Sequence, residues 1–201
     1  MSYRVNEIFY SIQGEGYWSG RSVVFCRFSG CNLWSGVENE RAAAICTFCD
    51  TDFVAFQEHT LDRLVSEITS LWPGGGSPMV VFTGGEPLLQ LDSTLTAALR
   101  HQGWYVAVET NGTKPINFAV DWVCVSPKTR TIKPVPDELK LVYPQERITP
   151  ELFADCGADY FWLSPMDGPN LPENTAAAFR YCLDHPNWRL NIQTHKVIGA
   201  R

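Results

Sequence analysis

Short apolar segments that each end in polar or glycine-rich residues recur along most of this chain. Residues 79–82, for example, run into Thr83-Gly84-Gly85, and residues 104–109 run into Thr110-Asn111-Gly112. Short, fully apolar strands are typical of parallel sheets, because both faces of such sheets are buried. The other segments with this pattern are residues 21–28, 121–125, 138–142, 160–163 and 188–193.

The chain length limits how many of these segments can close into a barrel. A full eight-fold βα barrel typically needs about 250 residues, so a shorter chain has room for about six strands; this chain has 201 residues. Helices are predicted at residues 61–72, 91–101 and 174–184, whereas between residues 109 and 151 the strands are joined by loops and no helix fits. With right-handed crossovers, the sequence predicts a partial, open (β/α)6-type TIM barrel in the α/β class. It has few helices in its second half and forms one domain over residues 1–201.

Three cysteines, Cys31, Cys46 and Cys49, lie in one stretch after the first predicted barrel strand. A structural zinc normally takes four protein ligands, so a zinc site would have to borrow Cys26 or His59. A thioredoxin-like pair would need a strand before its two cysteines, and residues 41–45 do not have that pattern. Three thiolates fit a four-iron, four-sulfur cluster with one iron left open for a small molecule.

Composition and charge exclude several function classes. The net charge of −6 and the absence of a Lys/Arg cluster argue against nucleic acid as a partner, since such binding depends on basic patches. No apolar run reaches the ~18 residues of a membrane span, and the N-terminus does not resemble a signal peptide. An odd number of cysteines, seven, suggests free thiols and a metal site in a cytoplasmic protein. Cys26, Cys124, Cys156 and Cys182 are interpreted as small buried hydrophobic residues.

Two further features indicate a binding site, although each has a simpler explanation. Arg27 alternates with apolar neighbours in its strand, so it either points inward, where it needs an anion, or is an ordinary surface arginine. Gln13-Gly14-Glu15-Gly16 either lets backbone amides approach a ligand or forms a hairpin turn.

Taken in order, these motifs resemble the 7-carboxy-7-deazaguanine synthases of the radical S-adenosylmethionine superfamily. The shared marks are the aromatic Phe48 before the last cysteine and a long gap of fourteen residues between Cys31 and Cys46. The others are F-Y-S-I-Q-G-E-G at 9–16, C-R-F-S-G-C-N-L-W at 26–34, C-D-T-D-F at 49–53, G-G-E-P at 84–87, E-T-N-G at 109–112, S-P-K at 126–128, P-M-D-G at 165–168 and Q-T-H-K at 193–196.

The resemblance implies a cluster held by Cys31, Cys46 and Cys49, with S-adenosylmethionine on its open iron as the source of a 5′-deoxyadenosyl radical. It also implies Mg²⁺ on Thr51, a homodimer, and an electron donor such as flavodoxin or ferredoxin. The residues implied to bind S-adenosylmethionine are Phe48, Cys49, Asp50, Gly84, Gly85, Glu86, Ser126, Pro127, Lys128, Ser164, Pro165, Met166 and Asp167.

The substrate that the resemblance implies is 6-carboxy-5,6,7,8-tetrahydropterin, which is converted to 7-carboxy-7-deazaguanine with loss of ammonia. Arg27 would pair with its carboxylate, and Glu109 is the candidate catalytic residue. The residues implied to bind this substrate are Ile12, Gln13, Gly14, Arg27, Thr83 and Arg201. Two alternatives stay open, a glycyl-radical-activating enzyme, which normally has a short cysteine gap, and a zinc-stabilised binding module without a reaction.

Overall fold

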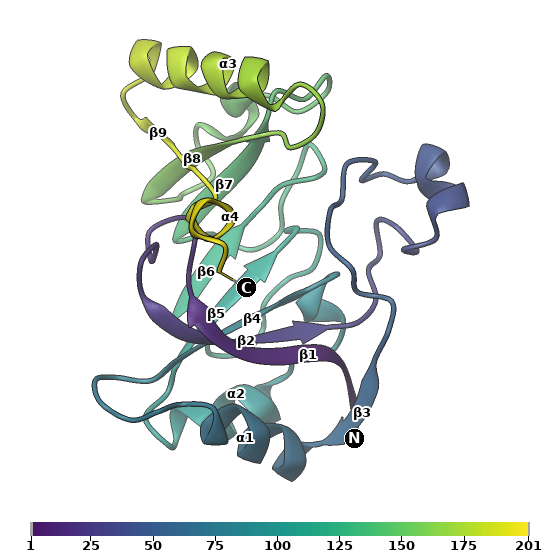
Figure 1. Cartoon of the computed structure of the whole chain (residues 1–201), viewed down its shortest axis with the longest axis vertical. Helices are drawn as coiled ribbons and strands as arrows, with labels where there is room; N and C mark the ends of the chain where they lie inside the picture. The colour runs from purple at the N-terminus through teal and green to yellow at the C-terminus, as the bar shows by residue number, and fades with distance from the viewer. Residues whose placement is uncertain (1, 201) are drawn as a thin grey trace.

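The computed structural model describes residues 2–200, and their nine strands form one sheet in the order β3-β1-β2-β4-β5-β6-β7-β8-β9 (Figure 1). The strands are β1 (Ser2–Ile12), β2 (Ser22–Phe28), β3 (Gln57–Thr60), β4 (Met79–Gly84), β5 (Tyr105–Thr110), β6 (Trp122–Val125), β7 (Glu138–Tyr143), β8 (Tyr160–Pro165) and β9 (Trp188–Leu190). Among the described residues, β2, β4, β5, β6, β7, β8 and β9 run parallel to one another, whereas β1 pairs antiparallel with both β2 and β3. The two edge strands, β3 and β9, do not pair with each other, so the barrel is open. This confirms the predicted fold class.

Helices are few and lie outside the sheet. The α-helices are α1 (Leu61–Ser70), α2 (Ser93–Arg100), α3 (Leu171–Asp184) and α4 (Thr194–Ile198), and the 3-10 helices are η1 (Glu38–Ala43), η2 (Pro87–Leu89) and η3 (Pro150–Phe153). Side chains cap α1 and α2, where Thr60 accepts from the backbone N–H of Arg63 and Asp92 accepts from that of Leu95. Between β5 and β8 the only helix in the described chain is η3, as the sequence predicted for the second half. No helix within residues 2–200 has the length and apolar character needed to cross a bilayer.

One predicted strand was too long, and one strand was not predicted. The predicted strand at 188–193 stops at Leu190, and the short helix α4 follows it. The strand β3 was missed because Gln57–Thr60 contains only polar and charged residues without an alternating pattern. It forms by pairing antiparallel with β1, from Ser2 opposite Thr60 to Val5 opposite Gln57.

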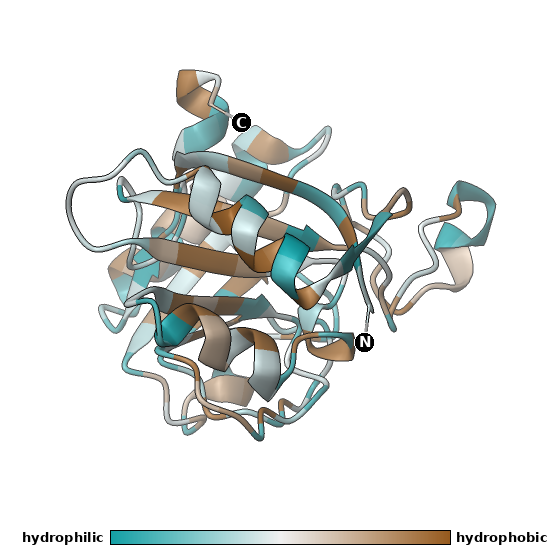
Figure 2. Ribbon diagram, turned by 90° about the horizontal axis from the view of Figure 1, so that it is seen from below, coloured by the Kyte–Doolittle hydropathy of each residue, from teal (hydrophilic) through white to brown (hydrophobic). Residues whose placement is uncertain are grey.

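Apolar residues fill the layers between the sheet and its covering helices, and one half of the barrel interior. One core cluster lies where α1 and α2 pack on the sheet, and a second lies under α3. Figure 2 shows many of the hydrophobic residues, coloured brown, on the strands. A third cluster, with Phe9, Val23, Phe25, Met79, Val81 and Ala107, fills the barrel interior toward the beginnings of the parallel strands. The interior toward their carboxyl ends is left to polar residues, which is where barrels of this type place their ligands.

Candidate active site

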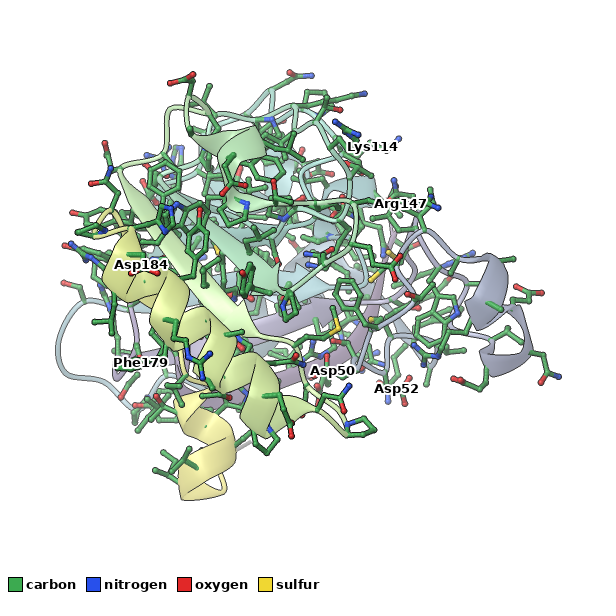
Figure 3. All side chains as sticks on the ribbon, turned by 90° about the horizontal axis from the view of Figure 1, so that it is seen from above. Asp50, Asp52, Lys114, Arg147, Phe179 and Asp184 are labelled. Atoms are coloured by element: carbon green, nitrogen blue, oxygen red, sulfur yellow. The ribbon has the colours of Figure 1, made fainter. Side chains whose placement is uncertain are left out.

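A cavity of about 580 Å³ opens at the carboxyl ends of the parallel strands. Its walls come from the cluster loop (residues 29–56), the ends of β4, β5 and β8, the turn between β1 and β2, and residues 193–196. Figure 3 views the molecule from above and labels Asp50 and Asp52, two carboxylates of the cluster loop that line the cavity. Segments far apart in the sequence therefore meet around one space.

All three predicted cluster cysteines line this cavity. Cys46 is buried, whereas Cys31 and Cys49 are half-buried. A hydrogen bond from Cys46 lowers the pKa of Cys49 to about 6, and donating that proton raises the pKa of Cys46. A low thiol pKa favours the thiolate, which is the form that binds iron. The donor set is therefore sulfur-only and partly ionised near neutral pH.

The three thiols do not form a ready-made site for a single metal ion in the described part of the chain. Within residues 2–200, no group of three His, Cys, Asp or Glu side chains is close enough to hold one metal ion. A cluster spreads its irons over a cube, so its thiolates lie further apart than the ligands of one zinc. The three cysteines thus surround a common cavity without forming a preformed zinc site.

The Gly84-Gly85 turn fixes the start of the cluster loop. A Cβ on Gly84, whose φ is +141°, would lie 2.2 Å from the carbonyl oxygen of Phe28, and a Cβ on Gly85 would lie 2.1 Å from that of Gly30. The backbone N–H of Glu86 donates to Gly30 at 2.9 Å. Only glycine allows β4 to approach β2 this closely, and Cys31, the next residue after Gly30, is held beside the turn.

Most residues predicted to bind S-adenosylmethionine line the cavity. The Nζ of Lys128 donates to the Oγ of Ser126 at 2.6 Å and lies 5.7 Å from the ring centre of Phe48. The lining members of the predicted set are Phe48, Cys49, Asp50, Gly84, Gly85, Ser126, Lys128, Ser164, Pro165 and Asp167. The structure therefore brings residues of the cluster loop, β4, β6 and β8 together, as the sequence predicted.

Three members of that set do not line the cavity: Glu86, Pro127 and Met166. The Glu86 side chain is fully buried and accepts hydrogen bonds from the Oγ1 of Thr110 (2.7 Å) and from the backbone N–H of Asn111 (2.8 Å). Burial raises the pKa of Glu86. Its carboxylate therefore ties the end of β5 to the β4 turn. Pro127 is buried. The backbone N–H of Met166 donates a hydrogen bond to the carbonyl of Tyr143, and its carbonyl accepts one from the Nδ2 of Asn174.

The predicted substrate residues also meet at the cavity, where Ile12, Gln13, Gly14, Arg27 and Thr83 all line the wall. Arg27 points inward, and its Nε donates to the Oε1 of Glu7 at 2.8 Å, so the chain itself supplies one anion. Glu109, the candidate catalytic residue, accepts from the Nε2 of Gln13 at 2.9 Å and from the Oγ1 of Thr83 at 3.4 Å. Arg201 lies outside the described residues.

Several lining residues were not predicted, namely Glu7, Glu15, Lys140, Gln193, His195 and Lys196. Lys140 could have been found, because a charged residue in an otherwise apolar buried strand is unusual. His195 had no predicted role; its ring packs on Gly14, where an added Cβ would lie 2.2 Å from its Nδ1. Glu15 and Gln193 carry no local signal, since the two partners lie 178 positions apart in the sequence.

The segment before α4 and its first turn close over the cavity mouth. The backbone N–H of Thr194 donates to Gly14 at 3.0 Å, and the Nζ of Lys196 contacts Asp50 (3.2 Å) and Asp167 (2.5 Å). Lys196 thereby links the cluster loop to the loop after β8.

Replacing Lys196 by methionine is expected to weaken binding of S-adenosylmethionine by about three- to tenfold, because exposed ion pairs each contribute little. Equilibrium binding to the reconstituted protein would measure this. Arg100→Met, which breaks an exposed ion pair with Asp121 outside the cavity, is the matched control and should leave the affinity unchanged. Equal losses in both variants would contradict a local role for Lys196.

The fold and the three-cysteine cavity define a radical S-adenosylmethionine enzyme, and residues 40–129 match the radical SAM superfamily. The chain is 51% identical to the 7-carboxy-7-deazaguanine synthase of Caulobacter vibrioides and 52% identical to that of Bordetella pertussis, with 99% of each chain covered in both comparisons. QueE from Escherichia coli has a similar crystal structure, with a TM-score of 0.75 at 26% identity over 97% of this chain and 95% of that one. This chain therefore belongs to the 7-carboxy-7-deazaguanine synthase family. Membership implies a 4Fe-4S cluster, S-adenosylmethionine, a small-molecule substrate and a reductant.

Proposed function

We propose that this chain converts 6-carboxy-5,6,7,8-tetrahydropterin to 7-carboxy-7-deazaguanine with loss of ammonia. The observation that carries the proposal is a cavity that joins the three cysteine thiols to a wall of Arg27, Gln13 and Glu109. A sulfur-lined end suits the cluster and its cofactor, and a wall with both signs of charge suits a zwitterionic, hydrogen-bonding substrate. The names of the relatives support the same reaction.

The proposed cofactor arrangement uses the residues already found in the wall. Cys31, Cys46 and Cys49 would hold the cluster, and backbone groups of Gly84 and Gly85 would meet the methionine end of S-adenosylmethionine. When bound, cluster and cofactor supply the radical that removes a hydrogen atom from the substrate. The chain's own residues orient the two molecules and exclude water.

Substrate binding would rest on complementary charge. The guanidinium of Arg27 is a forked donor suited to a carboxylate, and its pairing with Glu7 already orients it in the wall. Glu109 is an acceptor for ring N–H groups, and Gln13 holds it by a hydrogen bond at 2.9 Å.

Anaerobic incubation tests the proposed reaction. The reconstituted protein, given reductant, S-adenosylmethionine and 6-carboxy-5,6,7,8-tetrahydropterin, should release 7-carboxy-7-deazaguanine and ammonia in equal amounts. Cleavage of S-adenosylmethionine without any deazapurine product would refute the substrate while leaving the cofactor assignment intact.

Mg²⁺ is proposed to bind at Thr51, whose side chain lines the cavity between Asp50 and Asp52. Mg²⁺ prefers oxygen ligands and usually keeps several waters. Because no group of three His, Cys, Asp or Glu side chains in residues 2–200 could hold a metal ion, substrate oxygens and water are proposed to complete the shell. The ion would thus bind together with the substrate.

The electron donor is proposed to be a small acidic carrier such as flavodoxin or ferredoxin. Four cationic side chains sit in the loops after β5, β6 and β7, and none of them forms an ion pair or side-chain hydrogen bond within the described chain; they are Lys114, Arg130, Lys133 and Arg147. The loop after β5 reaches the cluster loop, since the Nδ2 of Asn32 donates to Thr113 at 2.9 Å, and Lys114 and Arg147 lie on the same edge in Figure 3. On a chain of net charge −6, this cationic rim is suited to an acidic partner.

Reversing two of these charges, with Lys133→Glu and Arg147→Glu together, is expected to raise the KM for the reduced carrier by about tenfold at low salt. Activity driven by dithionite should not change, because that reagent needs no docking surface. Arg180→Glu, an exposed cation on α3, is the control. If the carrier KM stays constant in the double variant, the rim is not the docking surface.

The homodimer and the cytoplasmic location stay proposals that follow from the family resemblance. Apolar side chains are exposed on α3 and α4, among them Phe179, Leu183 and Val197. Sedimentation equilibrium of the full chain would measure the oligomeric state directly.

A further inference from the structure

Lys140 is a buried cation in the cavity wall between two carboxylates. It lies in the middle of β7 with 8% of its surface exposed. Its Nζ is bonded to the Oε2 of Glu15, and it lies 3.6 Å from the Oε1 of Glu109. All three side chains line the cavity. Ionised groups are rarely buried unless they are paired, and here one lysine forms ion pairs with two glutamates.

Each carboxylate is also held by neutral donors. Gln13 and Thr83 donate to the two oxygens of Glu109. The Nε2 of Gln193 donates to the Oε1 of Glu15 at 2.6 Å. The network therefore joins the turn after β1, the strands β4, β5 and β7, and the segment before α4. Lys140 is its only cation among the described residues that contact either acid.

The charges in this network depend on one another. Burial alone would lower the pKa of Lys140 and favour its neutral form, but the nearby carboxylates of Glu109 and Glu15 raise that pKa well above its ordinary value. Burial also acts against an ionised Glu15, yet Lys140 and Gln193 lower its pKa to about 2. The remaining titratable groups that face Lys140 or Glu15 are Cys124, Lys128, Glu138 and His195.

We propose that Lys140 is a positioning residue that balances Glu15 and so keeps Glu109 an oriented carboxylate acceptor for the ring N–H groups of the reduced pterin. This inference rests on the proposed function. Two carboxylates that share a cavity without a cation repel each other, whereas Lys140 lies between Glu15 and Glu109 and attracts both. Without that cation, Glu109 would lose the contact that, together with Gln13 and Thr83, holds its oxygens in the cavity wall. Lys140 acts through Glu109 and needs no contact with the reacting atoms.

Lys140→Met tests the proposal because methionine keeps most of the length and volume of lysine without its charge. The substrate Kd of the cluster- and cofactor-loaded protein should rise by at least about thirtyfold, as expected when one partner of a buried ion pair is removed. The affinity for S-adenosylmethionine should change less than threefold, and KM should rise more than kcat falls. Lys140→Arg, which keeps the charge, should recover part of the affinity.

A second variant separates charge balance from packing. Adding Glu15→Gln to Lys140→Met removes one negative charge and restores the original net charge of the cavity. If Lys140 balances Glu15, the double variant should bind substrate within about fivefold of wild type, although each single variant is weaker. If Lys140 only fills space, the two losses should add.

Additive losses, or a substrate Kd unchanged in Lys140→Met, would overturn the proposal. Thermal unfolding of each variant identifies any that does not fold. In that case the substrate Kd values of the single variants Lys140→Arg and Glu15→Gln still test whether Lys140 balances the charge of Glu15. Failure of wild type to form the deazapurine would refute the proposed function. Normal wild-type turnover with unaffected Lys140 variants would refute this inference alone.

Discussion

Replacing Cys46 by serine is expected to remove the brown chromophore of the reconstituted protein and to lower turnover by about a thousandfold or more. The three cysteines are the sulfur donors that line the cavity, and clusters are held by thiolates, for which a hydroxyl is a poor substitute. Loss of Cys46 removes one of the three sulfur donors proposed to hold the cluster. Iron and sulfide content per chain and the rate of S-adenosylmethionine cleavage would measure both effects.

Cys182→Ser provides the matched control. Cys182 lies on α3, packs against the second core cluster and does not line the cavity. The same chemical change there should leave iron content and turnover within about twofold of wild type, since conservative changes away from a site have small effects. Full iron content in Cys46→Ser would mean that this residue does not hold the cluster.

The sequence predicted the barrel well because its strands carry their signal locally. A parallel strand is buried on both faces, so four to six apolar residues bounded by polar ones identify it. The strand β3 has no such signal, since Gln57–Thr60 is held by pairing with Ser2–Val5 at the start of the chain. The helix α4 was missed for a related reason. Its five residues are too few to show helical periodicity, and it is held by contacts with Gly14, Asp50 and Asp167.

The candidate site was predictable where residue type alone limits the chemistry. Cysteine spacing and the glycine pair identified the cluster loop and the turn that fixes it. The position of Glu86 behind the cavity wall could not be predicted, because it depends on Thr110 and Asn111, its hydrogen-bond partners at the end of the next barrel strand. The Lys140 network was missed because it is assembled from residues up to 178 positions apart. Such partnerships are set by the strand order, which a single sequence does not reveal.

Gly84→Ala is expected to destabilise the apoprotein by at least about 3 kcal/mol, because it combines a strained backbone with a clash that cannot relax. The added Cβ would lie 2.2 Å from the oxygen and 2.7 Å from the nitrogen of Phe28. Both are backbone atoms of β2, the parallel partner of β4 in the sheet, so neither can move without breaking the sheet. Denaturant unfolding of the metal-free protein would measure the loss.

Gly168→Ala separates the two causes. Gly168 also has a positive φ, +126°, but a Cβ there would meet nothing within 4 Å. Only backbone strain remains, so the cost should be about 1–2 kcal/mol. Similar unfolding free energies for the two variants would show that the close approach of β4 to β2 is unimportant. A further result should follow if that approach positions the cluster loop: any folded Gly84→Ala protein should hold less iron than folded Gly168→Ala, because the residue displaced with Phe28 and Gly30 is Cys31.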